Sequence, residues 1–263
     1  MNIYYTSTGF LVILPQNDCH EIVDAMLDTN YGEDFCVADN FSPEFVSRLM
    51  EAGFLVMSAK YEDFEDGCFL LPKLHLVRSA LFFENLHIKK SIRRLLPRYE
   101  LQPNAEFDRI VDLCVEKHGS DWLTSPLIEC IRKIRDTSPS PGVLAPSANA
   151  YPASFALYRN GKLVAGEFGV VCGRVYTSYS GYYDEDNAGT VQIILTAQYL
   201  EKNGFSFFDL GMPLDYKTGL GAVNISTHEF VELFRGAVRE NHGAADRGAV
   251  SQDVFQPLFF PKI

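Results

Sequence analysis

The sequence lacks the features that would assign it to a disulfide-rich, metal-binding or membrane-spanning class. Its six cysteines lie far apart without a C-x-x-C pair, and its six histidines form no i, i+4 pair. These spacings argue against a disulfide framework or a zinc site and favour reduced, mostly buried thiols. The longest apolar run near the N-terminus, residues 10–14, is too short to span a membrane, and no leader pattern accompanies it. We therefore expect a cytoplasmic protein with no metal and no membrane partner.

Basic residues are scarce in the first part of the chain. Residues 1–70 contain thirteen Asp and Glu but only Arg48 and Lys60, whereas the rest of the chain has twenty-one residues of each sign. The net charge of −11 therefore arises in the first part and does not exclude a local polyanion site. One basic stretch, residues 73–98, has a single acid, Glu84. Its basic members are Lys73, Arg78, Lys89, Lys90, Arg93, Arg94 and Arg98.

Turn signals and periodicity predict an α+β fold. Asn160-Gly161 between two apolar runs indicates a type I′ hairpin, and helical spacing with caps indicates the helices. The predicted order is β-β-β-α-β-α, with the last strand beside the hairpin strands and helices covering the sheet. The elements are strands at 155–158, 163–171, 174–179 and 205–210, and helices at 42–53, 104–118, from 125, at 187–202 and at 226–239.

The domain organisation follows the change in composition. We expect an acidic N-terminal domain over residues 1–72 and an acyltransferase-like domain over residues 73–263, which includes a basic helix at 85–98. The Pro/Ser-rich stretch 137–152 cannot hold a helix or a central strand and predicts a mobile loop or a linker.

Asp209 ends a predicted buried strand and precedes a turn-rich loop, residues 211–221. A carboxylate in that place can orient an amine or accept a substrate N–H. It can equally cap the turn, which is the commoner role of an aspartate at such a place. The residues leave both interpretations open.

The segment from residue 85 to 98 can divide its side chains between two faces. At helical spacing Ile88, Ile92 and Leu95 or Leu96 can point inward while the cations point to water. Such a surface is either a solvated helix face or a contact for a nucleic-acid backbone, and the lack of basic clusters elsewhere favours the second. Trp122, the single tryptophan, either stacks on a base or packs in the core.

Coenzyme A is disfavoured as a ligand. The glycine-rich pyrophosphate loop that precedes the corresponding helix of acetyl-CoA-dependent enzymes is absent. In its place stands the acidic segment 184–189, whereas a pyrophosphate is bound by backbone N–H groups and positive charge.

Several segments in order along the chain carry a family resemblance. They are FSPEFVSRLMEAGF at 41–54, RSALFFENLHIKKSIRR at 78–94, DWLTSPLIECIRKI at 121–134, GKLVAGEFGVVCGRVYTSYSGY at 161–182 with DNAGT at 186–190, and FFDLGMPLDYKTGLGA at 207–222. The most specific parts are LHIKKS at 86–91 and the spacing from Asp209 to Leu220-Gly221-Ala222. Together these segments resemble the leucyl/phenylalanyl-tRNA–protein transferases.

The resemblance implies an N-terminal α/β domain followed by an N-acetyltransferase-like mixed sheet with flanking helices. It implies aminolysis of an aminoacyl-tRNA ester by the N-terminal α-amine of a protein or peptide, with no cofactor. Asp209 and Asn187 match catalytic positions, and Trp122 matches the residue that stacks on the terminal adenosine. The residues expected to contact the tRNA backbone are Arg78, Lys89, Lys90, Arg93 and Arg94.

The sequence also departs from the family pattern. A Pro-Trp-Phe element reads Val56-Met57-Ser58 here, and a Trp-Trp-Ser-Pro segment is reduced to Leu71-Pro72. Tyr179 stands in place of a glutamate that helps to select a basic acceptor, and Gly211 in place of a glutamine. We expect an altered adenine site and an altered acceptor pocket around Tyr179 and Gly211. Two alternatives stay open: a tRNA-independent acyl- or peptidyltransferase, and an inactive binding homologue.

Overall fold

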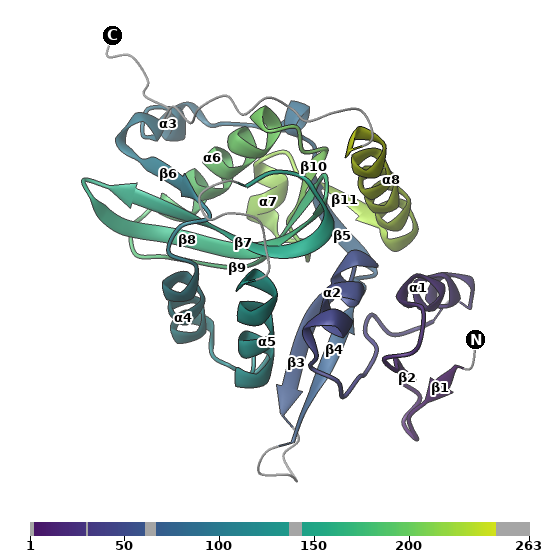
Figure 1. Cartoon of the computed structure of the whole chain (residues 1–263). Coiled ribbons are helices and arrows are strands. Elements are labelled where there is room, and N and C mark those ends of the chain that lie inside the picture. Colours follow the sequence, from purple (N-terminus) through teal and green to yellow (C-terminus); the bar gives the residue numbers. More distant parts are fainter. Residues whose placement is uncertain (1–2, 30, 61–66, 137–143, 246–263) are drawn as a thin grey trace.

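The computed structural model describes residues 3–29, 31–60, 67–136 and 144–245, with side chains up to residue 240. Its centre is a seven-stranded mixed sheet with the strand order β11-β5-β10-β9-β8-β7-β6. Helix α6 (Ala188–Lys202) covers one face, and α2 (Pro43–Glu51), α4 (Phe107–His118) and α5 (Ser125–Asp136) cover the other (Figure 1). The predicted α+β class, a mixed sheet with flanking helices, is confirmed.

The middle of the sheet is an antiparallel meander. Strands β7 (Ser147–Arg159), β8 (Lys162–Gly173) and β9 (Val175–Tyr183) pair in sequence. Asn160 and Gly161 both have positive φ, 51° and 74°, as a type I′ turn requires. Strand β10 (Phe207–Asp209) then pairs parallel with β9, as the predicted element order requires.

Elements at the two edges complete the sheet and were not predicted. Strand β5 (Val77–Leu81) pairs antiparallel with both β10 and β11 (Val223–Ser226), and β6 (Glu100–Pro103) pairs with β7 at the other edge. A short helix, α7 (Asp215–Gly219), lies between β10 and β11, and α8 (Thr227–Ala245) ends the described part of the chain. No helix of these described ranges is both long and apolar enough to cross a membrane.

The N-terminal part forms smaller elements against the same core. They are β1 (Tyr4–Tyr5), β2 (Leu11–Val12), α1 (Cys19–Asp28), α2, β3 (Leu55–Lys60) and β4 (Cys68–Lys73). One cluster of buried apolar side chains extends from Leu11 to Ala237 and joins these elements to the main sheet. The domain boundary between residues 72 and 73 stays a prediction.

The Pro/Ser-rich stretch contains the first part of β7, so the prediction of a loop or linker is wrong for residues 147–152. Pro152 of β7 faces Val170 of β8. Strand β6 pairs with β7 only from Phe155 to Tyr158. Pro152 therefore lies where β7 is paired on one side, a position at which a missing N–H is tolerated. Residues 137–143, the first part of the predicted mobile loop, lie outside the described residues.

The predicted helix over residues 85–98 is also wrong. Helix α3 (Lys90–Arg93) is a single turn, with 3₁₀ turns at Phe83–Asn85 and Leu96–Arg98 on either side. Leu86 and Lys89 are extended, with ψ of 111° and 140°. A residue that leaves the helical region interrupts the i to i−4 hydrogen bonds, so the turns cannot merge. The predicted division of faces holds, because Ile92 and Leu96 are buried.

Candidate active site around Asp209

Asp209 is fully buried at the end of β10, and both of its oxygens accept hydrogen bonds. Arg78 on the neighbouring strand β5 donates from Nε to Oδ1 and Oδ2, at 2.9 and 3.1 Å, and from Nη2 to Oδ2 at 2.7 Å. The Thr177 hydroxyl donates to Oδ2 at 2.9 Å, and the Gly211 N–H donates to Oδ1 at 2.9 Å. The bond from Gly211 is the turn cap considered from the sequence, and it coexists with a buried ion pair.

The charges around Asp209 keep it ionised despite its burial. Burial raises the pKa of Asp209, but the Arg78 charge and the hydrogen bonds from Arg78, Gly211 and Thr177 lower it further, so the net pKa lies below the ordinary value. A carboxylate so occupied has little capacity to take a proton near neutral pH. Its direct effect is to fix the start of the loop after β10.

Arg78 lies in the core, with an exposed fraction of 1%. Its guanidinium carbon lies 4.3 Å from the centre of the Phe230 ring, a cation–π contact. Nη1 lies 3.3 Å from Nδ1 of His75. Because a guanidinium has no acceptor, Nδ1 of His75 must be the unprotonated nitrogen. Arg78 thus contacts Asp209 and His75 in this structure, and its predicted contact with tRNA stays untested.

His75 is buried and neutral. Burial, with the positive charges of Arg78 and Lys73, lowers the pKa of His75 to about 3. Neutral imidazole can accept from Arg78 through Nδ1, whereas imidazolium would add a second buried cation. His75 therefore supports Arg78 only in its neutral form.

A second cation holds the loop after Asp209. Lys217 on α7 is buried, and its Nζ donates to the carbonyls of Leu210 at 2.6 Å and Met212 at 2.8 Å. Burial lowers the pKa of Lys217 to about 8, and the Arg78 charge acts in the same direction while Asp209 opposes it. Residues 209–217 thus form one unit fixed by a carboxylate at its start and an ammonium at its end.

The end of this loop contacts the basic segment directly. His87 donates its N–H to the carbonyl of Leu220 at 2.8 Å. Gly221 has a φ of 98°, and a Cβ there would lie 1.9 Å from the carbonyl oxygen of Asn85. Only glycine permits this approach. The structure therefore brings together the two most specific motifs of the sequence, LHIKKS and Leu-Gly-Ala.

The cations of this segment face water. Ile92 and Leu96 anchor the segment in a cluster with Leu220 and buried residues of α6. Four exposed cations lie within this segment: Lys89, Lys90, Arg93 and Arg94. None of them forms an ion pair within the part of the chain that the structure describes. By contrast, Lys73 is paired with Asp34 at 3.1 Å.

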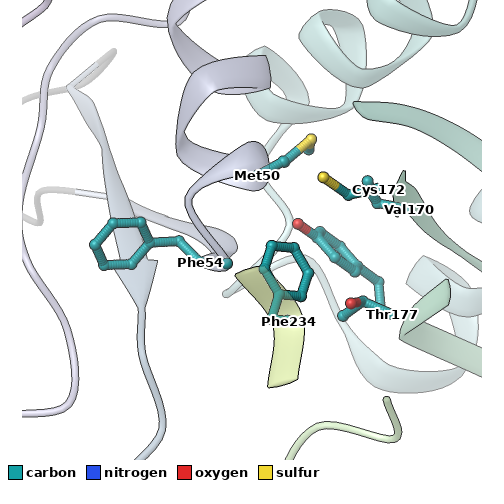
Figure 2. A pocket seen from close by; sticks show the side chains of 8 residues that line it. Met50, Phe54, Val170, Cys172, Thr177 and Phe234 are labelled. Atoms are coloured by element: carbon teal, nitrogen blue, oxygen red, sulfur yellow. The ribbon is translucent and has the colours of Figure 1, made fainter. Parts of the chain in front are cut away.

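A small pocket lies next to Asp209 on the face of the sheet that α2 and α8 cover. Figure 2 shows Met50, Phe54, Thr177 and Phe234 around it, and Tyr179 completes its lining. The Thr177 hydroxyl on this face is the one that binds Asp209. Gly211, the other residue predicted for the acceptor pocket, does not line it.

Tyr179 is engaged with the N-terminal part of the chain. Its hydroxyl accepts the backbone N–H of Val56 at 3.1 Å. Burial raises the pKa of Tyr179, so its phenol is neutral at physiological pH. The hydroxyl therefore closes one wall of the pocket next to Asp209.

Trp122 is half-buried against the main core. Its carbonyl accepts the N–H of Ser58 at 2.9 Å. The Ser58 hydroxyl in turn accepts from the N–H and the hydroxyl of Thr124, both at 2.9 Å. These bonds fix the backbone from Trp122 to Thr124, while Trp122 itself stays half-buried.

Asn187 is exposed at the N-terminus of α6, on the opposite face of the sheet from Trp122. It has a left-handed conformation with φ of 68°, and its side chain makes no capping hydrogen bond. Its amide group is free to bind a ligand. No hydrogen bond of the described residues joins Asn187 or Trp122 to Asp209, so these two predicted site residues stay separate from the buried centre.

Sequence reasoning missed three polar groups of this region: His75, Lys217 and Glu167. Nothing in their local sequence shows that these side chains are buried, which only the tertiary contacts reveal. The one signal that could have identified Lys217 is its place in the glycine-rich loop that follows Asp209. Among the described residues, no group of three or more His, Cys, Asp or Glu could hold a metal ion.

Comparison with known proteins gives one consistent family. The family model described as leucyl/phenylalanyl-tRNA protein transferase matches residues 80–235. A protein of that name from Pseudomonas putida (strain W619) is 26% identical over 175 residues, covering 65% of this chain and 72% of its own length. Another from Campylobacter jejuni (strain RM1221) is 22% identical over 214 residues, covering 77% and 88%. Among solved structures, a GCN5-related N-acetyltransferase from Kribbella flavida is 13% identical, with a TM-score of 0.34 and coverage of 83% and 78%.

Proposed function

The chain belongs to the leucyl/phenylalanyl-tRNA protein transferase family, and from that premise we propose that it transfers a hydrophobic, leucine- or phenylalanine-like amino acid from aminoacyl-tRNA to a protein N-terminus. It is an aminoacyltransferase. In the reaction the nitrogen of a neutral α-amine attacks the ester carbonyl at the tRNA 3′-adenosine. The C–O bond of the ester then breaks, the tRNA hydroxyl leaves with the proton that the amine loses, and a new peptide bond remains.

One observation carries the proposal: the docking of the basic segment on the loop that begins at Asp209. The bond from His87 to Leu220 and the close packing of Gly221 against Asn85 make these two segments one rigid unit. A tRNA backbone bound by the cations of residues 89–94 would therefore have a fixed position relative to the loop of residues 209–221. Such positioning is a large part of what a transferase without a cofactor contributes.

We assign different roles to the two predicted catalytic residues. Asp209 acts as a positioning residue, because both oxygens already accept hydrogen bonds from Arg78, Thr177 and Gly211. Asn187 has a free amide at a helix N-terminus, where a donor can stabilise the negative charge that develops on the ester oxygen. Trp122 lies on the opposite face of the sheet from Asn187, so its predicted stacking on the terminal adenosine is not part of this proposal.

We propose that this protein does not select a basic N-terminal residue on its acceptor, because the carboxylate that would bind such a residue is replaced by Tyr179. Tyr179 presents a neutral phenol that is already bonded to Val56. Gly211 has a φ of 72° and donates its N–H to Asp209, so this position supports the loop backbone and offers no side chain. The pocket that Tyr179 lines has room for about one water molecule, so this part of the proposal rests on the lost carboxylate alone.

The test compares two double charge reversals. Arg93→Glu with Arg94→Glu should reduce transfer from labelled aminoacyl-tRNA at least tenfold, a loss of about 1.4 kcal/mol or more. It should also flatten the slope of log affinity against log salt by at least about 1.4. Lys133→Glu with Lys162→Glu, which alters two exposed cations far from the segment in sequence, is the matched control and should change neither quantity.

Transfer that persists unchanged in the Arg93/Arg94 variant would overturn the proposal. The altered Val56-Met57-Ser58 element favours one other candidate, a tRNA-independent acyltransferase. That enzyme would consume a small-molecule thioester in the presence of an amine and would bind no aminoacyl-tRNA. A protein that does neither is an inactive binding homologue.

A further inference from the structure

A buried carboxylate lies on the α6 face of the sheet, apart from the Asp209 centre. Glu167 on β8 has an exposed fraction of 4%. Its Oε2 accepts from the Ser178 hydroxyl at 2.8 Å, but its Oε1 has no hydrogen-bond partner among the described residues. An ionisable group buried this deeply normally has partners for both oxygens.

Other unsatisfied polar atoms gather beside Glu167. Gln192 on α6 is 3% exposed, and its Oε1 also lacks a partner within the described ranges, although its amide nitrogen donates to Thr196 at 3.1 Å. The Thr196 hydroxyl and the Gln192 amide lie close enough to lower the pKa of Glu167 as donors, although neither reaches hydrogen-bond distance of Oε1. The hydroxyl of Tyr176, close enough to interact with Glu167, is unsatisfied as well. Two buried acceptor oxygens, Oε1 of Glu167 and Oε1 of Gln192, therefore lack a donor at hydrogen-bond distance among the described residues.

The nearest cation does not neutralise this carboxylate. Lys217 lies close enough to lower the pKa of Glu167 in part, but its Nζ donates to the carbonyls of Leu210 and Met212. Burial dominates, so the pKa of Glu167 is raised above its ordinary value. A cation that also donates hydrogen bonds would satisfy both the free oxygen and the charge.

A ligand can approach Glu167 from the side of β9. The residue opposite Glu167 in the sheet register is Gly181, which is exposed and has no side chain to cover the carboxylate. Beyond it Tyr183 and Tyr216 are both about half exposed, at 52% and 53%. The loop fixed by Lys217 adjoins the same region, because Lys217 interacts with both Glu167 and Asp209.

We propose that Glu167 and Gln192 form a binding site for a cationic amine of the substrate. The inference rests on the proposed function, because aminolysis of an aminoacyl ester involves two α-amines. The donor amino acid keeps its own α-amine as an ammonium, and the acceptor N-terminus arrives as an ammonium before it loses a proton to react. Both sources present the same chemistry to Glu167, whatever the side chain of the transferred amino acid.

The experiment measures binding by calorimetry with two pairs of probes. The donor pair is phenylalanyl-3′-amino-3′-deoxyadenosine, whose amide replaces the labile ester, and its Nα-acetyl form. The acceptor pair is a tetrapeptide with a free or an acetylated N-terminus. Each probe is titrated into the wild-type protein, into Glu167→Gln, which keeps the shape and removes the charge, and into Ser178→Ala. Glu201→Gln, on the exposed side of α6, is the matched control.

We expect acetylation to weaken the binding of one pair to the wild type by about 10- to 100-fold, the range of a charge-assisted hydrogen bond. In Glu167→Gln the same acetylation should cost less than about threefold, and Ser178→Ala should lie between the two. The pair that responds identifies the amine. Equal losses in the wild type and Glu167→Gln for both pairs, or no loss in the wild type, would overturn the inference.

Failure of this inference and failure of the proposed function can be told apart by assaying transfer separately. A wild-type protein that transfers amino acids without any dependence of amine binding on Glu167 retains its function and loses this site. A protein that binds an amine through Glu167 but transfers nothing retains the site and loses the function. Thermal unfolding of Glu167→Gln checks that the variant is folded, and removal of a buried charge should not lower its stability.

Discussion

Arg78 and Asp209 form a buried ion pair in which Nη2 of the arginine lies 2.7 Å from Oδ2 of the aspartate. The exposed fractions of the two side chains are 1% and 0%. The pair joins β5 to β10, two strands that are 131 residues apart in sequence at these positions. Its strength decides whether the loop after Asp209 keeps its conformation.

Removing the arginine should therefore be costly. Arg78→Met leaves the Asp209 carboxylate buried without a counter-charge, and we expect the free energy of unfolding to fall by about 3–5 kcal/mol. Urea denaturation measures the loss. In the double variant Arg78→Met with Asp209→Leu, which buries no charge, most of the loss should be recovered. A loss below about 1 kcal/mol in the single variant would show that the pair is not formed.

His75 should make the protein sensitive to mild acid. Its pKa is about 3 in the folded state and near 6.5 when unfolded, so between these values the unfolded chain binds the extra proton. Stability is therefore lost as the pH falls below 6.5. We expect the wild type to lose about 2 kcal/mol at pH 5 from this group, and His75→Gln to lack that loss. Parallel curves of unfolding free energy between pH 7 and pH 5 would contradict this assignment.

Lys217 should make the stability of the protein depend on pH in the alkaline range. Its pKa is about 8 when folded and 10.5 ordinarily, so the folded protein binds fewer protons than the unfolded chain between these values. The free energy of unfolding should therefore rise with pH between pH 8 and pH 10.5 because of Lys217. The stability of the wild type relative to Lys217→Met should increase by about 2 kcal/mol from pH 8 to pH 9.5. Chemical denaturation at the two pH values measures the difference, and no change would place Lys217 in a solvated environment.

The bond from Val56 to Tyr179 connects two positions at which the sequence departs from the family pattern. A proline in place of Val56 would have no N–H to donate, so the tyrosine hydroxyl and the valine N–H come as a matched pair. Tyr179→Phe should lower the free energy of unfolding by about 1–3 kcal/mol, because it leaves the Val56 N–H without a partner. Tyr183→Phe, at an exposed position, is the control and should have little effect. Equal effects of both changes would contradict the role of this bond.

Much of the sheet could be predicted from local signals. The Asn160-Gly161 turn, the two long helices before it, the order β7-β8-β9-α6-β10 and helix α8 follow from turn chemistry and periodicity. The edge strands β6 and β11 and the strand β5 next to β11 could not be found, because each is only four or five residues long and is stabilised by pairing with strands distant in sequence. The prediction of a helix over residues 85–98 was wrong because the apolar spacing there reflects tertiary packing. That spacing suits packing on Leu220 and α6 without continuous helical hydrogen bonds.

The site was predictable in its motifs and not in its contacts. Asp209, the Leu-Gly-Ala element and LHIKKS were identifiable, but nothing local shows that Gly221 packs on Asn85. The burial of Arg78 was hidden, since arginine in a basic stretch is usually exposed. Glu167 lies in an apolar strand where a charged residue is unexpected, and only the positions of Ser178 and Gln192 show why it matters.

Transfer of a labelled amino acid to a peptide is the most direct test of the central claim. The purified protein is incubated with a panel of labelled aminoacyl-tRNAs and peptides that differ in their N-terminal residue, and the products are resolved by mass. We predict a peptide lengthened by one residue, formed from leucyl- or phenylalanyl-tRNA, dependent on a free α-amine, and lost in Arg93→Glu with Arg94→Glu. No lengthened peptide from any aminoacyl-tRNA, under conditions in which the protein is folded, would contradict the assignment of this chain as a transferase.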